Sequence, residues 1–396
     1  MVYHCYSMYK IKWSFWALLC VLSVSTLYAM PPIKLGMSAP FTGPSGRLGT
    51  QLLEGASLYF DKLNTEGGIH GQPVQIHSYD DRYDPLLTVY NTARFLQRDH
   101  IPLLFQYVGT PTTTLMLPLL NTGDFQPLLM FPFTGAEALR EMPYQPMIYN
   151  IRASYREETK TLVDFFITQK KYKIAILYQA DAYGRSGWDG VSKALHTHRL
   201  ELVGEATYER GFPFTKSMKT QIDILKRSDP DAIIIIGTYA ASAAFIRDAR
   251  EDHWDLPIGN LSFVGVESLL ELLNQHAGQY QKRYENIYTT QVLPYYKDRS
   301  LPAINEYLTL SKKAGKTPNY VGFEGYINAK LLSQLLRKTT PPFAIEKLST
   351  LLQNNHSIDI GLGHSLAIGG KEHQGSHRVY LTQITGGNIA PVHKAP

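Results

Sequence analysis

The amino-acid sequence predicts an α/β protein made of two doubly wound, Rossmann-like lobes, each with a sheet between layers of helices. Short apolar runs alternate with amphipathic helical stretches along nearly the whole chain. The alternation is given twice, with a break near residues 149–153. Residues 233–236 are apolar at every position, as is typical of a parallel strand covered on both faces.

The first unit shows the pattern most clearly. Residues 33–39 form an apolar strand, and the glycines and proline of residues 41–46 break it. A helix follows, on which apolar residues recur at helical spacing, namely Leu52, Ala56, Tyr59 and Leu63. Gly67 and Gly68 end this helix, and residues 74–79 form the next strand. Such a βαβ unit offers a ligand the loop beyond the carboxyl end of its first strand.

The later elements repeat this order. Further strands are expected at residues 102–109, 127–133, 173–179, 232–239 and 261–266. Helices are expected at residues 157–169, 215–228, 301–314 and 323–337.

The chain is expected to cross between the lobes several times. We assign residues 30–151 and 288–364 to the N-terminal lobe, and residues 152–287 and 365–396 to the C-terminal lobe. No low-complexity linker separates the two halves. Several short crossings in place of one linker would form a hinge.

The N-terminal segment, residues 1–29, has the layout of a secretory signal peptide. Lys10 and Lys12 precede the apolar residues 13–27, and Ala29 offers a small residue for cleavage. An uncleaved membrane anchor would need a longer apolar stretch. We therefore expect export and cleavage near Ala29.

Composition excludes several classes of function. Both cysteines, Cys5 and Cys20, fall in the predicted signal peptide, so no disulfide is expected in the mature chain. A formal net charge of +5, without a long run of Lys or Arg, is too mild to indicate nucleic-acid binding. The sequence holds no nucleophile elbow and no standard metal-ligand spacing, so neither an enzyme nor a cofactor is expected.

Four short motifs resemble a known family. Residues 40–46, 66–71, 79–81 and 182–184 are similar, in this order, to the type I periplasmic binding proteins. The likeness runs from residue 33 to about residue 392 and is greatest to the leucine/isoleucine/valine-binding (branched-chain amino acid ABC transporter substrate-binding) family.

The resemblance implies two lobes joined by three crossovers that close on a ligand. It also implies an exported, periplasmic and monomeric solute-binding component of an ABC importer. That protein would capture an amino acid or analogue and deliver it to an ABC permease in the inner membrane. The alternative is a ligand-sensing receptor of the same fold, for an amide, urea or other small polar solute, that signals to a partner.

The resemblance also places the family's carboxylate-binding residues. Its Ser/Thr cluster matches residues 110–114, with Thr113 as the best match and Thr112 the next, and its second binding loop matches Thr134. Hydroxyls and amides at a helix start suit an anion, because the helix dipole favours negative charge there. The alternative is that the same threonines serve only as helix caps.

The family's residues from the other lobe match Tyr183, Tyr239 and Glu267. The two tyrosines would supply flat apolar walls, and Glu267 would pair with the ligand ammonium, which is costly to bury without a counter-charge. Alternatively, Tyr183 is a tyrosine at the edge of the core and Glu267 an acid of a helix start. Glu324 could also lie near the cleft or only begin its own helix.

Three features depart from the family pattern. Leu48 stands where the family often has an aromatic residue, and Phe133 stands where a small residue is usual. The cysteine pair common near the Ser/Thr cluster is missing. These changes affect the expected side-chain selectivity of the site more than the class of ligand.

Overall fold

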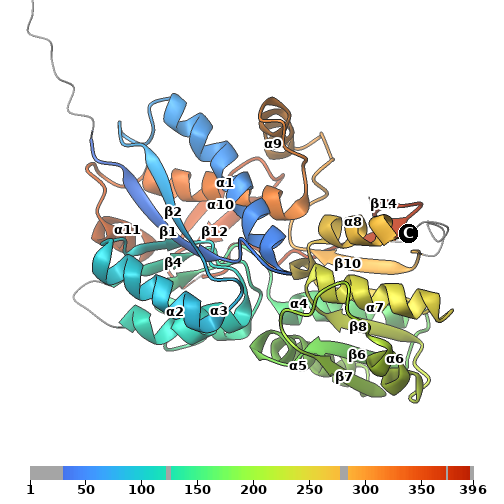
Figure 1. Cartoon of the computed structure of the whole chain (residues 1–396). Helices are drawn as coiled ribbons and strands as arrows, with labels where there is room; N and C mark the ends of the chain where they lie inside the picture. The colour runs from blue at the N-terminus through green and yellow to red at the C-terminus, as the bar shows by residue number, and fades with distance from the viewer. Residues whose placement is uncertain (1–29, 122–125, 277–283, 372, 393–396) are drawn as a thin grey trace, which may run out of the picture.

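The computed structural model describes residues 30–121, 126–276, 284–371 and 373–392. It has the predicted α/β architecture of two lobes placed side by side (Figure 1). The predicted signal peptide and its cleavage site near Ala29 lie outside the described residues. Among the helices of the described part, none combines the length and the apolar character that a bilayer crossing requires.

The N-terminal lobe contains a parallel sheet in the order β2-β1-β3-β4-β5. Its strands are β1 (Ile33–Ala39), β2 (Val74–Asp80), β3 (Leu103–Phe105), β4 (Leu128–Met130) and β5 (Ile148–Tyr149). Its helices are α1 (Gly46–Thr65), α2 (Pro85–Ala93), α3 (Thr110–Met116), α9 (Pro302–Lys313), α10 (Tyr320–Leu336) and α11 (Ile345–Leu352). Shorter helical turns are η1 (Arg94–Arg98), η2 (Leu117–Asn121), η3 (Glu137–Leu139) and η4 (Gln145–Met147).

Helices α1 and α10 pack so closely that their backbones touch. A Cβ atom built on Gly55 would lie 1.8 Å from the carbonyl oxygen of Gly322, and one built on Gly325 would lie 2.1 Å from that of Leu52. Only glycine fits at these two positions. The contact fixes α10, and with it Glu324, against the rest of the lobe.

The C-terminal lobe contains a second sheet in the order β14-β13-β10-β9-β8-β6-β7. Its strands are β6 (Ile174–Gln179), β7 (Gly204–Tyr208), β8 (Ala232–Ile236), β9 (Ile258–Asn260), β10 (Ile287–Gln291), β13 (Tyr380–Thr385) and β14 (Asn388–Pro391). Its helical elements are α4 (Tyr155–Thr168), α5 (Ala182–Thr197), α6 (Lys219–Lys226), α7 (Tyr239–Glu251), η5 (Ser262–Val264) and α8 (Val266–His276). Strands β13 and β14 pair antiparallel, whereas β6 to β10 run parallel.

Two crossings lie elsewhere than expected. Strand β10 pairs with β9 and β13, so Tyr288 stays in the C-terminal sheet, and the crossing begins after Gln291. Among the described strands, β12 (Ser365–Ile368) pairs with β11 (His356–Asp359) alone, and it lies beside the N-terminal lobe in Figure 1. The last crossing therefore falls between β12 and β13.

The prediction of a strand at residues 261–266 is wrong. The strand in this region, β9, ends at Asn260, and the chain then turns through η5. Gly265 ends this turn in the left-handed region, with φ of 70°, where glycine is favoured. The apolar residues of this segment, Leu261, Phe263, Val264 and Val266, are buried outside the sheet, and Phe263 packs against rings of both lobes.

Candidate ligand-binding site between the lobes

The strand ends of the two lobes meet at a cluster of aromatic rings. Phe263 lies at its centre, with ring centroids 6.2 Å from Tyr83, 5.3 Å from Phe133 and 4.8 Å from Tyr183. Tyr183 also lies 5.3 Å from Tyr155. Tyr83 and Phe133 belong to the N-terminal lobe and Tyr183 and Phe263 to the C-terminal lobe. This interlobe aromatic cluster therefore joins the two lobes.

The start of α3 brings Thr110, and the loop after β4 brings Thr134, beside Tyr155 of this cluster. The hydroxyls of Thr110 and Thr134 lie 2.7 Å apart, and the hydroxyl of Thr134 accepts a hydrogen bond from the amide of Ala136. Thr113 lies one helical turn beyond Thr110. Its hydroxyl is buried and has no hydrogen-bond partner among the described residues. A donor in this state favours binding of an acceptor group from a ligand.

Thr112 has a different role from its neighbour. Its hydroxyl donates to the carbonyls of Val108 and Gly109, the second at 2.9 Å. These bonds hold the turn at Gly109, whose φ of 97° suits glycine. The hydroxyl of Thr112 is thus used within the turn, but it does not cap the helix, because in the described part of the chain no side chain accepts a hydrogen bond from the first amides of α3.

Tyr183 is positioned by the start of α5. The carboxylate of Asp181 accepts a hydrogen bond from the amide of Tyr183 at 3.0 Å and so caps the helix. The hydroxyl of Tyr183 donates to the carbonyl of Gly237 at 3.4 Å. Gly184 lets the helix approach β6, because a Cβ atom there would lie 1.8 Å from the carbonyl oxygen of Gln179. The ring of Tyr183 is thereby directed into the aromatic cluster.

Tyr239 lies at another part of the interface. Its hydroxyl accepts a hydrogen bond from the amide of Arg47, in the other lobe, at 3.2 Å. Next to it, Leu48 packs against Gly265. A Cβ atom built on Gly265 would lie only 2.9 Å from Leu48 Cδ2. The Arg47 side chain forms an ion pair with Glu271. Leu48 therefore packs between the two lobes, beside Tyr239.

The structure does not bring Glu267 to the aromatic cluster. Its carboxyl faces Tyr296, Tyr320 and Lys297, and lines a cavity of about 590 Å³ beside α8 whose lining includes neither Thr113 nor Tyr183. Burial raises the pKa of Glu267 to about 7, against smaller opposing contributions from its polar neighbours.

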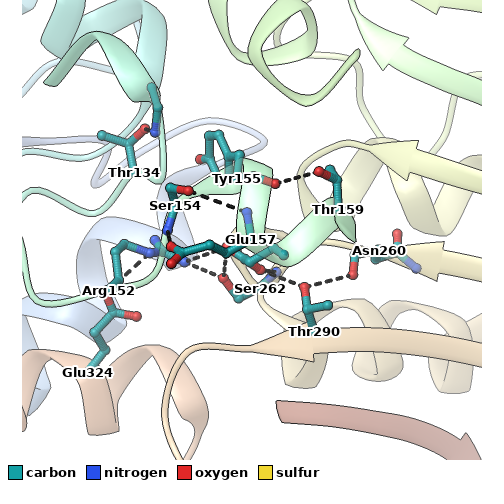
Figure 2. A network of polar contacts seen from close by, with 12 residues as sticks. Thr134, Arg152, Ser154, Tyr155, Glu157, Thr159, Asn260, Ser262, Thr290 and Glu324 are labelled. Atoms are coloured by element: carbon teal, nitrogen blue, oxygen red, sulfur yellow. Dashed lines mark hydrogen bonds and ion pairs between the residues drawn. The ribbon is translucent and has the colours of Figure 1, made fainter. Parts of the chain in front are cut away.

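A cluster of buried polar side chains around Arg152, and not Glu267, lies beside the aromatic cluster (Figure 2). The Arg152 Nη2 donates to the Ser262 hydroxyl and lies 3.8 Å from Glu158 Oε1. Its Nε lies 3.7 Å from Glu324 Oε1, and its guanidinium lies 4.5 Å from the ring centroid of Phe133. We call Arg152, Glu158, Ser262 and Glu324 the interlobe hub. It joins α10 of one lobe to α4 and η5 of the other.

The electrostatics of the hub keep Arg152 charged. Burial by itself would lower the pKa of Arg152, but Glu324 and Glu158 raise it above its ordinary value. Nε and Nη1 of Arg152 are buried without a hydrogen-bond partner among the described residues. The guanidinium therefore retains unused donors at the site.

Sequence reasoning missed Arg152, Glu158 and Phe263 as site residues. Glu158 had a recognisable pattern, since it lies on the apolar face of α4 between Tyr155 and Leu162 at helical spacing. An acid on such a face indicates a buried polar partner. Arg152 directly follows the last strand of the first lobe, where the chain crosses.

Comparisons with known proteins identify the family. A family model described as "Periplasmic binding protein" matches residues 32–388, so the chain belongs to the periplasmic binding protein family. The crystal structure of a possible leucine/isoleucine/valine-binding protein from Rhodopirellula baltica SH 1 is 27% identical, with a TM-score of 0.82. The match covers 92% of this chain and 97% of that one.

Curated relatives point to the same branch. The Leu/Ile/Val-binding protein homolog 3 of Brucella melitensis is 23% identical over 56% of this chain, and the Leu/Ile/Val-binding protein of Escherichia coli strain K12 is 24% identical over 58% of it. The chain spans 59% and 61% of the lengths of these two relatives. The predicted resemblance to type I periplasmic binding proteins is confirmed. The matched family is one of binding proteins and not of enzymes.

Proposed function

We propose that this protein is the exported solute-binding component of an ABC importer and binds a small amino acid or analogue between its lobes. One observation carries the proposal. Polar groups suited to a zwitterion lie against the interlobe aromatic cluster: the charged hub around Arg152 contacts Phe133, and the hydroxyls of Thr110 and Thr134 lie beside Tyr155. In such a place unpaired charge is costly, so a ligand with matching groups is favoured.

The proposed contacts come from both lobes. Thr113 and Thr134 would bind the carboxylate of the ligand at the start of α3, with Thr112 holding the turn. Tyr183 would contact the ligand from the C-terminal lobe, and Tyr239 would secure closure through its bond to Arg47. A ligand held by both lobes binds the closed state better than the open one and so shifts the population towards closure.

The family supports delivery to a permease. The relatives from Brucella melitensis and Escherichia coli are named as Leu/Ile/Val-binding proteins. We propose the same role here: periplasmic capture of the solute after cleavage of the signal peptide near Ala29, and transfer from a monomeric protein to a partner permease in the inner membrane.

A ligand screen tests the proposed function. We expect amino acids, but not urea or simple amides, to raise the melting temperature of the chain from residue 30 onward, because ligand binds the folded state alone. Thr113→Val should weaken the affinity of the best ligand by about 10-fold to 150-fold, since a hydrogen bond to a charged group contributes about 1.5–3 kcal/mol. The exposed Thr309→Val serves as the control. No stabilisation by any amino acid would reject the proposed ligand class.

Truncation of Tyr183 tests closure. Tyr183→Ala removes a ring that is buried between Tyr155 and Phe263. We expect the dissociation rate of the amino acid to rise by about 10-fold or more while the association rate changes little, because interface changes act mainly on release. Stopped-flow fluorescence measures both rates. An unchanged dissociation rate would contradict the assigned role of Tyr183.

A further inference from the structure

The first turns of α1 face α8 of the other lobe. The guanidinium of Arg47 donates two hydrogen bonds to the carboxylate of Glu271, one to each oxygen, and the bond from Nη2 to Oε1 is 2.7 Å long. One turn further along α1, the side-chain amide of Gln51 donates to the Ser268 hydroxyl at 3.3 Å. We call Arg47, Gln51, Ser268 and Glu271 the α1–α8 contact. Both of its side-chain pairs join the N-terminal lobe to the C-terminal lobe.

Neighbouring groups orient the two charged side chains of this contact. The backbone amide of Arg47 donates to the hydroxyl of Tyr239 in the C-terminal lobe, at 3.2 Å. The start of α1 is therefore bound to that lobe independently of the guanidinium. On α8, the side-chain amide of Gln275 donates to Glu271 Oε1 at 3.1 Å. A bidentate pair between oriented side chains loses less side-chain freedom than an ordinary exposed ion pair, so it contributes more.

The ion pair is charged and open to solvent. The hydrogen bond from Arg47 lowers the pKa of Glu271, and the hydrogen bond to Glu271 raises the pKa of Arg47. Both groups are therefore ionised near neutral pH. Their side chains are 42% and 48% exposed, so salt can screen the pair. The Debye length falls from about 30 Å at 0.01 M to about 3 Å at 1 M ionic strength.

A pair that joins the lobes acts on their closure. Hinge opening moves Arg47 away from Glu271, whereas an ion pair within one lobe moves as a unit. The free energy of the interlobe pair therefore stabilises the closed state relative to the open one. The residues proposed to contact the ligand, Thr113, Thr134 and Tyr183, are not part of the α1–α8 contact. Its contribution to closure therefore adds to that of the ligand.

From these contacts we propose that Arg47 and Glu271 form a salt-sensitive latch that favours the closed lobes and slows release of the solute. The proposal rests on the proposed function and adds its regulation, since ionic strength would set how long the solute is held. Release requires the lobes to open, so the latch lowers the dissociation rate. Affinity also depends on how far the lobes close before the ligand enters. The dissociation rate is therefore the clearer measure.

Charge reversal and its compensation test the latch. The probe is the amino acid that most stabilises the wild-type protein, and stopped-flow fluorescence at low salt measures its dissociation rate. Arg47→Glu places two carboxylates together and should raise this rate by about three- to tenfold, because an attraction of an exposed pair becomes a repulsion. Adding Glu271→Arg restores an opposite-charge pair and should return the rate to within about twofold of the wild type.

An ion pair within one lobe provides the matched control. Lys316 and Glu54 are also partly exposed and lie 2.6 Å apart, but both belong to the N-terminal lobe. Lys316→Glu reverses a charge there without affecting any interlobe pair. It should change the dissociation rate by less than about twofold, because exposed pairs contribute little to the stability of a lobe. Circular dichroism confirms that each variant is folded.

Salt dependence gives a readout that a purely structural role would not change. The dissociation rate of the wild type should rise by about two- to fivefold between about 0.01 M and 1 M sodium chloride, because salt screens the exposed pair. The uncharged double variant, Arg47→Gln with Glu271→Gln, should show a smaller rise. Comparison of the two removes any general effect of salt on the protein.

The outcomes separate the latch from the proposed function. If amino acids bind but Arg47→Glu releases them at the wild-type rate, the latch is rejected while the proposed function stands. A raised rate that Glu271→Arg does not restore also rejects the latch, because the two residues then act separately. If no amino acid binds the wild type, the proposed function is rejected and small-angle X-ray scattering decides on the latch. Equal radii of gyration of Arg47→Glu and the wild type in low salt would then reject the latch as well.

Discussion

Arg152→Met is expected to lower the free energy of unfolding by about 3–5 kcal/mol, the usual effect of removing one partner from a buried ion pair. Arg152 is 1% exposed, and its removal leaves Glu158 and Glu324 facing each other without a cation. The Ser262 hydroxyl also loses its donor. Methionine fills much of the volume of the arginine side chain. The loss of stability therefore reports the removal of the charge rather than the creation of a cavity. Urea denaturation followed by circular dichroism gives the value.

A double variant identifies the cause of this loss. Arg152→Met combined with Glu324→Gln should recover part of the stability, because Glu158 keeps its hydrogen bonds from Ser262 and Thr290 while the second acid becomes neutral. Arg185→Met, an exposed change on α5, should have an effect below about 0.5 kcal/mol. Equal stability of Arg152→Met and the wild type would show that the hub does not hold the lobes together. Loss without recovery in the double variant would assign the effect to packing on Phe133.

The fold could be predicted because it depends on local patterns. An apolar run such as residues 233–236 and a helical spacing such as that of α1 can be recognised from neighbouring residues alone, without knowledge of distant contacts. The error at residues 261–266 has a general cause. A short apolar run indicates burial, but burial in an interface and burial in a sheet leave the same pattern.

The site could be predicted only in part, because its charges come from distant segments. Thr134 and Tyr183 follow strand ends, and both lie at the interlobe aromatic cluster, as the carboxyl ends of parallel strands predict. Arg152, Glu158 and Glu324 meet only once both lobes and the crossings are in place. No local spacing indicates which of two glutamates, Glu267 or Glu324, faces the hub.

The close contact of α1 with α10 links the stability of the N-terminal lobe to the position of Glu324. Gly325, the residue after Glu324, lies against the backbone of Leu52, and Gly55 lies against that of Gly322. Any side chain at these glycines must push the helices apart, since backbone atoms cannot turn away as a flexible side chain can. Such a shift would carry Glu324 away from Arg152, which it meets at 3.7 Å.

Gly55→Ala is therefore expected to destabilise the protein by about 2–3 kcal/mol, as overpacking of a close contact usually does, although alanine in a helix is otherwise favoured by about 1 kcal/mol. The clash is with a carbonyl oxygen that the added Cβ would approach to 1.8 Å. Ser57→Ala on the same helix should be nearly neutral. Thermal unfolding checks the stability, and calorimetry checks whether affinity for the amino acid falls as well. A melting temperature and affinity equal to those of the wild type would show that α10 can shift without moving Glu324.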